Sequence, residues 1–232
     1  MTPPYKLRSI RKKILPGMTS PVACSLEAIL KVDGPNSPFC VYSELVATRL
    51  AQTIHIPVAI GVITKEQTSD AYASIEIGTK GLRLLALLPR QYAKAATQYK
   101  DEAAALMVFD IFIGNGDRRG NLKASFVTPH HQIFQGFDHE RALLGIENNP
   151  MESIKALRNG DLIVDFHPFY KLTHPLMMYK WCERIEKLDD TLIHECCEMG
   201  RPIGEVTVAM QKLLAEALIA RKKYIRDLAK YK

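Results

Sequence analysis

The chain has 232 residues, of which 47% are hydrophobic and 24% charged, and it contains 13 glycines and 13 prolines. This composition excludes collagen-like, coiled-coil and largely disordered proteins, and it is typical of a globular chain of one or two domains. The apolar runs fall well short of the roughly 18 residues that a membrane-spanning helix needs. The basic start leads into Pro16 and Gly17 instead of an apolar segment, so we expect a cytoplasmic protein without a membrane span or a secretory signal.

The formal net charge of +6 lies mainly at the two ends of the chain. Residues 1–13 and 221–232 each have a net charge of +5, so the residues between them sum to −4. Nucleic-acid-binding folds usually place positive charge on a structured face, whereas charge at the ends is typical of solvated tails. We therefore expect short basic ends that could contact an acidic partner, and no nucleic-acid-binding fold.

The predicted elements change from mostly strands to mostly helices near residue 100. Before it we expect a long strand or strand pair over 22–32, a turn at 33–38, a helix over 43–53, and strands over 56–63 and 72–77. After it we expect a helix over 101–113, strands over 122–127 and 132–137, and helical segments that end in 204–228. This order predicts one α+β domain, with a strand-rich N-terminal lobe at about 14–80 and a mainly helical C-terminal lobe at about 81–232. A ligand is expected in the cleft between the lobes.

The five cysteines are expected to be reduced and mostly buried. Their number is odd and they form no C-x-x-C pair, which is typical of a protein from a reducing compartment. His194 with Cys196 and Cys197 matches zinc-ligand spacing poorly, so the sequence does not favour a metal–thiolate site.

Asp117, Asn121 and Asp138 are the residues that most directly indicate chemistry. The predicted helix over 101–113 leads into the loop NGDRRGN at residues 115–121, then into a strand, and Asp138 follows the next strand. Two adjacent strands would bring these side chains to one edge. Two carboxylates and an amide oxygen suit Mg²⁺, which binds few protein ligands together with phosphates. The alternative is a polar turn held by Asx hydrogen bonds, and Asp138 as a third group favours a site.

The order and types of these residues resemble the HipA-like branch of the protein-kinase superfamily, and they are also similar to lipid kinases of the phosphoinositide type. Residues 115–121 resemble the catalytic loop, which supplies an Asp and a downstream Asn, and Phe137-Asp138-His139 resembles the metal-binding motif. His139 stands where eukaryotic protein kinases have a Phe. The resemblance runs from Gly17 to the final helix, and it implies a compact bilobal protein-kinase-like fold that uses ATP and Mg²⁺.

Kinases also need a strand lysine on the α- and β-phosphates that is held by a helix glutamate. Lys31 ends an apolar stretch of the predicted strand, and Glu44 lies thirteen residues later near the start of the predicted helix. Taken alone, Lys31 resembles a lysine at a sheet edge and Glu44 a first-turn helix acid. Placed ahead of Asp117, Asn121 and Asp138 in the kinase order, they are interpreted as the ATP-binding pair.

The loop that would cover the phosphates is expected at Gly17, Thr19 and Ser20. No G-x-G-x-x-G run or Walker lysine motif is present, which excludes P-loop NTPases. HipA-like relatives resemble this chain in having a short Gly/Thr/Ser turn, where backbone N–H groups and hydroxyls can meet phosphate oxygens. A simple entry turn is the alternative. The strand and hinge at 72–78 are where the adenine is expected to lie.

The catalytic loop departs from the common kinase pattern, because Asn121 follows Asp117 by four residues instead of five. Arg118 and Arg119 within it could neutralise charge on the transferred phosphoryl group. They could equally bind a phosphorylated activation segment or face solvent.

These observations predict an ATP- and Mg²⁺-dependent phosphotransferase in which Asp117 acts as positioned base. Asn121 and Asp138 are expected to hold Mg²⁺, and Lys31, set by Glu44, to anchor the phosphates. The resemblance implies a serine/threonine protein kinase, with a protein substrate or a regulatory protein as partner. The main alternative is a non-catalytic kinase-like nucleotide-binding module that acts through a protein partner, and a weaker one is a small-molecule or lipid kinase.

Overall fold

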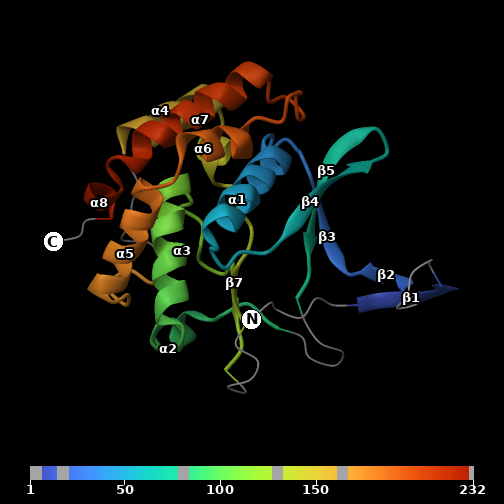
Figure 1. The fold of residues 1–232 in the computed structure, drawn as a ribbon, viewed down its shortest axis with the longest axis horizontal. Coiled ribbons are helices and arrows are strands. Elements are labelled where there is room, and N and C mark those ends of the chain that lie inside the picture. The colour runs from blue at the N-terminus through green and yellow to red at the C-terminus, as the bar shows by residue number, and fades with distance from the viewer. Residues whose placement is uncertain (1–6, 15–20, 78–83, 127–132, 161–166, 230–232) are drawn as a thin grey trace.

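The computed structural model describes residues 7–14, 21–77, 84–126, 133–160 and 167–229 (Figure 1). The strand-rich part contains β1 (Leu7–Ile14), β2 (Val22–Leu26), β3 (Ala28–Val32), α1 (Cys40–Ile54), β4 (Gly61–Glu66) and β5 (Ser69–Ile75). The remainder contains α2 (Tyr92–Gln98), α3 (Lys100–Ile113), β6 (Leu122–Ala124), β7 (Phe134–Gly136), α4 (Pro150–Asn159), α5 (Pro175–Glu186), α6 (Asp190–Cys197), α7 (Val208–Lys222) and α8 (Ile225–Leu228), with 3₁₀ turns at Pro89–Gln91 and Leu143–Gly145. The predicted change from strands to helices near residue 100 is confirmed.

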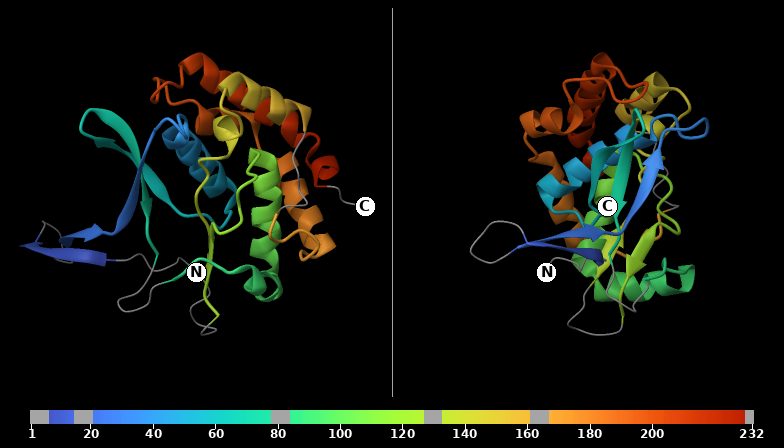
Figure 2. Two further views of the ribbon diagram at one scale, coloured as in Figure 1. Left: turned by 180° about the vertical axis from the view of Figure 1, so that it is seen from behind. Right: turned by 90° about the vertical axis from the view of Figure 1, so that its right-hand side faces the viewer.

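The strands form three small antiparallel sheets, in the orders β1-β2, β3-β5-β4 and β6-β7. The β1–β2 hairpin extends away from the rest of the molecule (Figures 1 and 2). In the central sheet Lys31 lies opposite Tyr72, and the Tyr72 hydroxyl lies 2.5 Å from the Thr48 hydroxyl of α1. Because residues paired across antiparallel strands share a face, Lys31 points to the same side of the sheet as α1.

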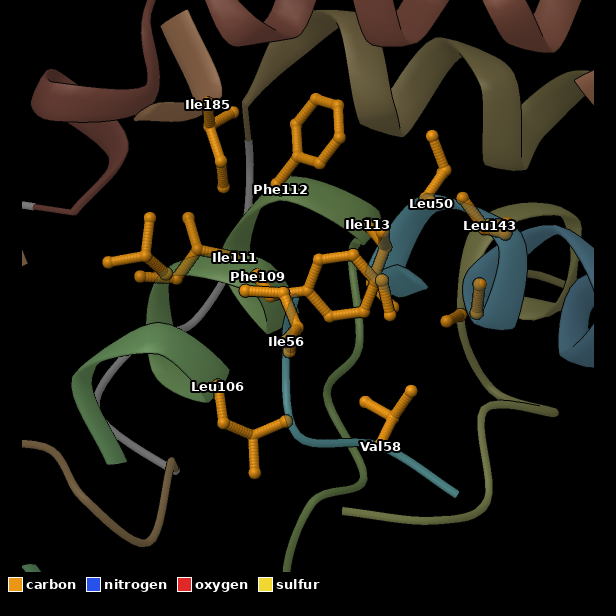
Figure 3. Packing of buried hydrophobic residues seen from close by; sticks show 14 of the residues in the cluster. Leu50, Ile56, Val58, Leu106, Phe109, Ile111, Phe112, Ile113, Leu143 and Ile185 are labelled. Atoms are coloured by element: carbon orange, nitrogen blue, oxygen red, sulfur yellow. The ribbon is translucent and has the colours of Figure 1, made fainter. Parts of the chain in front are cut away.

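Helix α1 lies between the central sheet and the other helices (Figures 1 and 2). Twelve of its fifteen residues are buried, and every residue of α3 from Ala103 to Ile113 is buried. Helices that bury most of their residues, mainly apolar ones, are typical of a protein core. Figure 3 shows how Leu50 of α1, Ile113 of α3 and Leu143 join one hydrophobic cluster. This cluster runs through both the strand-rich and the helical parts and fixes α1 against them.

Several predicted boundaries shift in the structure. The segment 22–32 forms two strands that do not pair with each other, because β2 pairs with β1 and β3 pairs with β5. The helix expected over 43–53 begins at Cys40, and the strand expected over 56–63 begins at Gly61. The last predicted helix is divided into α7 and α8. Cys24 is exposed, whereas the other four cysteines are buried and all five are free.

The sequence suggested that both basic ends are solvated tails, and the structure contradicts this. Residues 7–14 form β1, and Arg221 and Lys222 are buried at the end of α7. The Arg221 guanidinium donates hydrogen bonds to the Ile111 and Leu157 carbonyls, which satisfies the donors that burial removes from water. Among the described residues no helix has the length and apolar character that crossing a membrane requires.

Candidate active site

Lys31 of β3 brings together two acidic residues from distant parts of the chain. Its ammonium lies 2.5 Å from Glu44 Oε1 on α1 and 2.6 Å from Asp138 Oδ1, which follows β7. Burial by itself lowers the pKa of Lys31, but the charges and hydrogen bonds of Glu44 and Asp138 raise it above its usual value. The structure thus places Lys31 and Glu44 together, as the sequence analysis expected, and adds Asp138 to the same pair.

Glu44 is the most buried member of this group, with 3% of its side chain exposed. Its Oε1 also accepts a hydrogen bond from the His139 backbone N–H at 3.0 Å, and its Oε2 lies 3.3 Å from His139 Nδ1. Burial by itself raises the pKa of Glu44, yet the interactions with His139 and Lys31 lower it to about 2. The carboxylate is therefore held in its charged form inside the protein.

Asp117 and Asn121 lie in the loop between α3 and β6. Asp117 is exposed, and its backbone N–H donates to Asn115 Oδ1 at 3.1 Å. The Asn115 contact is an Asx-type hydrogen bond, and the Asn121 side-chain amide adds a second bond to the loop by donating to the Asp117 carbonyl at 2.8 Å. The polar turn that the sequence offered as the alternative to a site is therefore present.

The pairing of β6 with β7 brings Asn121 next to the segment that contains Asp138. Leu122 lies opposite Gly136, and the Phe137 N–H donates to the Asn121 carbonyl at 3.1 Å. Asn121 precedes β6 and Asp138 follows β7, so antiparallel pairing puts both at one end of the two-stranded sheet. Asp138 has a positive φ of 63°, a conformation that Asp tolerates better than most residues and that is frequent at functional sites.

Arg118 is enclosed and its donors are used within the protein, which contradicts the expectation that it is available to a phosphoryl group, a phosphorylated segment or solvent. Only 1% of its side chain is exposed, and its guanidinium binds the Asp110 carboxylate of α3 at 2.7 and 2.8 Å. It also donates to the carbonyls of Asn121, at 3.0 Å, and Phe137, at 2.6 Å. Each of these acceptors lies in or next to the segments that present Asn121 and Asp138. Arg118 therefore joins α3, the loop and β7 from within, while its neighbour Arg119 is exposed.

Asp110 is the buried centre of this network and is not among the site residues predicted from the sequence. Asn115 donates to Asp110 Oδ1 at 3.0 Å, and His167 Nε2 lies 3.0 Å from Oδ2. Burial by itself raises the pKa of Asp110, but Arg118 and His167 hold it well below its usual range. Burial lowers the pKa of His167 despite the nearby carboxylate. An acid within the apolar stretch from Ala103 to Ile113 was the signal that could have indicated a buried partner.

The predicted phosphate-binding loop, the hinge and the metal ligands remain to be placed. Gly17, Thr19 and Ser20 lie outside the described residues, as does Gly78 at the expected hinge. No group of three His, Cys, Asp or Glu side chains that could hold a metal occurs in the described part of the chain. The candidate ligands are instead one carboxylate, Asp138, and one amide oxygen, Asn121.

Comparison with solved structures shows which class of protein has this fold. The Helicobacter pylori proinflammatory kinase CtkA superposes with a TM-score of 0.63 at 17% identity, over 97% of this chain and 94% of that one. HipA of Shewanella oneidensis, solved with HipB and operator DNA as a toxin–antitoxin system, gives a TM-score of 0.54 at 15% identity, over 91% of this chain and 62% of that one. No protein-family model and no curated protein sequence matches the chain.

These likenesses show that the chain has a HipA-like kinase fold. The predicted α+β class and the resemblance to HipA-like kinases are confirmed at the level of the fold.

Proposed function

We propose that this protein is an ATP- and Mg²⁺-dependent phosphotransferase, a HipA-like kinase that phosphorylates a serine or threonine hydroxyl of a protein. The observation that supports it most is the contact of the Lys31 ammonium with both Glu44 and Asp138. Phosphoryl transfer is catalysed mainly by positioning and charge stabilisation, which requires a fixed cation and a nearby metal-binding carboxylate. Residues 1–232 are proposed to form one such kinase domain.

The donor chemistry of the site fits Mg²⁺. Asp138 is 28% exposed and Asn121 is partly exposed, and Mg²⁺ is usually held by one or two protein oxygens, waters and substrate phosphates. Asn121 and Asp138 would hold the ion, which when bound supplies charge neutralisation to the phosphates. Lys31 would contact the α- and β-phosphates, with Glu44 fixing its position from behind. Asp117, the exposed carboxylate of the loop, would orient the acceptor hydroxyl and accept its proton.

The protein acceptor and a protein partner rest on likeness to other proteins. CtkA is described as a kinase, and HipA was solved in complex with HipB. Transfer of these properties to the present chain is by analogy of fold. We place the protein in the cytoplasm on the same basis, together with its five free cysteines.

A second candidate function is a kinase-like nucleotide-binding module without catalysis. The observation that favours it is the short loop, in which Asn121 follows Asp117 by four residues and uses its side-chain N–H group to bond the Asp117 carbonyl. In this case the cleft would bind ATP–Mg²⁺ and the protein would act through its surface.

Transfer of phosphate from labelled ATP to the protein itself or to a generic protein substrate tests the proposal. We expect transfer by the wild type and none by Asp117→Asn, with nucleotide binding retained in both. Asp227→Asn, which changes an exposed acid of α8, is the matched control and should remain active. A thermal shift with ATP and Mg²⁺ but no transfer by the wild type would support the binding module, and no shift at all would contradict both functions.

A further inference from the structure

The Glu44 carboxylate is held on both of its oxygens by a single residue, His139. The backbone N–H of His139 binds Oε1 at 3.0 Å, and the ring Nδ1 lies 3.3 Å from Oε2. The Glu44 side chain is 3% exposed and the His139 side chain 1%. A carboxylate can only accept hydrogen bonds, so Nδ1 acts as the donor in this contact.

We propose that His139 is a positioning residue, whose ring keeps Glu44, and through it Lys31, in the arrangement that binds the nucleotide phosphates. This inference rests on the proposed kinase function. It gives a role to His139, for which the kinase resemblance implies none.

Lys31 by itself does not satisfy Glu44. Its ammonium is shared with Asp138 at 2.6 Å, and in a nucleotide complex it must also contact phosphate oxygens. Each of these acceptors draws the ammonium away from Glu44, which leaves a buried carboxylate in need of other donors. The two donors of His139 supply them without depending on the position of Lys31.

The surroundings of the ring indicate that this contact determines its position. The ring packs edge-on against Phe109 of α3, with ring centroids 6.4 Å apart. Its other nitrogen, Nε2, is buried and has no hydrogen-bond partner among the described residues. The Glu44 contact is therefore the polar interaction that sets the orientation of the ring within the described part of the chain. A phenylalanine, the residue that eukaryotic protein kinases have at this place, would keep the packing and the backbone N–H but lose the bond to Oε2.

Two substitutions separate the hydrogen bond from the shape of the ring. His139→Phe keeps an aromatic ring without a donor, and His139→Asn supplies an amide N–H near the position of Nδ1. We expect His139→Phe to weaken ATP–Mg²⁺ binding and raise KM for ATP by about tenfold or more, with a smaller change in kcat, since a lost hydrogen bond to a charged buried group is of this size. His139→Asn should restore binding to within about threefold of the wild type. His194→Phe, which removes the half-exposed His194–Glu198 contact, is the control and should bind like the wild type.

Equal ATP affinity of His139→Phe and the wild type would overturn the inference. Equal weakening by His139→Phe and His139→Asn would also overturn it, because the ring would then act by packing and not through its hydrogen bond. If His139→Phe does not fold, His139→Leu replaces it, since Leu matches Asn in size and has no donor. Crystal structures of the nucleotide-free variants also test whether His139 positions Glu44 and Lys31. This test does not depend on ATP binding by the wild type, whose absence would contradict the proposed function but not the positioning role. We expect the Lys31–Glu44 contact to persist in His139→Asn and to open beyond 4 Å in the donor-free variant; an intact contact there would refute the positioning role.

Discussion

At the scale of single residues, the site depends on charges that are buried in different degrees. Glu44 is almost completely enclosed, Lys31 has 17% of its side chain exposed, and Asp117 lies in solvent. Removing one partner of a buried ion pair leaves an uncompensated charge, whereas removing an exposed charge changes the free energy of unfolding little. The residues of the proposed catalytic site should therefore differ sharply in their effect on stability.

Replacing Lys31 by Met should weaken both nucleotide binding and the fold, because Glu44 loses its cation. We expect a decrease in the free energy of unfolding of up to about 3–5 kcal/mol, reduced to the extent that His139 and water compensate. Asp117→Asn should abolish transfer and leave the nucleotide-free protein about as stable as the wild type. Denaturant midpoints without ligand measure both, and a larger loss for Asp117→Asn would show that Asp117 is a structural residue of the loop.

Glu44 should also make stability depend on pH in the acid range. Its pKa is about 2 in the folded protein, below the usual value of 4.5. A carboxyl group with a lowered folded pKa stabilises the protein above its unfolded pKa, and this contribution is lost as the pH falls from about 4.5 towards 2. The free energy of unfolding should therefore decrease less over this range in Glu44→Gln than in the wild type. Parallel pH profiles for the two proteins would contradict this assignment of the pKa.

At the scale of elements, the loop between α3 and β6 is held from inside by Arg118. Its guanidinium binds Asp110 on α3, the Asn121 carbonyl before β6 and the Phe137 carbonyl after β7. His167 reaches the same Asp110 from a segment 57 residues further along the chain. The loop that presents Asp117 and Asn121 is thus built around a buried ion pair, although its surface consists of exposed polar residues.

Arg118→Met should be among the most destabilising single substitutions in the chain. It leaves the fully enclosed Asp110 carboxylate without its guanidinium, at a cost of roughly 3–5 kcal/mol in the free energy of unfolding. Arg119→Met, next to it but exposed, should cost less than about 1 kcal/mol. Urea unfolding of the two variants makes the comparison, and similar losses would mean that Asp110 finds other partners when Arg118 is absent.

At the scale of the whole molecule, α1 connects the strand-rich and helical parts. It packs on the central sheet through Tyr72 and Thr48, and its Tyr42 hydroxyl donates to the buried Cys197 carbonyl at 2.8 Å. On its exposed side, the Arg49 guanidinium donates to the Glu195 carbonyl at 2.5 Å. A helix with partners on both sides cannot leave one part without disrupting the other.

The central sheet and α3 should therefore unfold together as one cooperative unit. Native-state hydrogen exchange tests this, because amides that open only in global unfolding share one free energy of opening. We expect the slowest amides of β5 and of α3 to report the same value, and ATP with Mg²⁺ to raise both equally. A distinctly lower value for β5 would mean that the strands open separately, and it would contradict the proposal of a single domain.

The sequence by itself determined several of the elements and the order of the candidate site residues. Apolar periodicity located α1, α3 and β5 to within a few residues, because helices and strands bury side chains at fixed local spacings. The kinase resemblance implied Lys31, Glu44 and Asp138 as site residues, and in the structure the Lys31 ammonium contacts both carboxylates. Their order along the chain was sufficient to predict that they meet, because the resemblance supplied the fold that brings them together.

Only the tertiary structure decided which charges are buried and what they meet. Arg118 and Arg119 are adjacent in the loop and equally polar, yet one is enclosed and the other exposed. Arg221 lies in a basic terminal run but binds carbonyls 110 and 64 residues away. Burial of a charge is favourable only where distant segments supply its partners, and those partners are assembled by packing, which no local pattern encodes. His139 follows the same rule, because its ring acquires a role only when α1 places Glu44 against it.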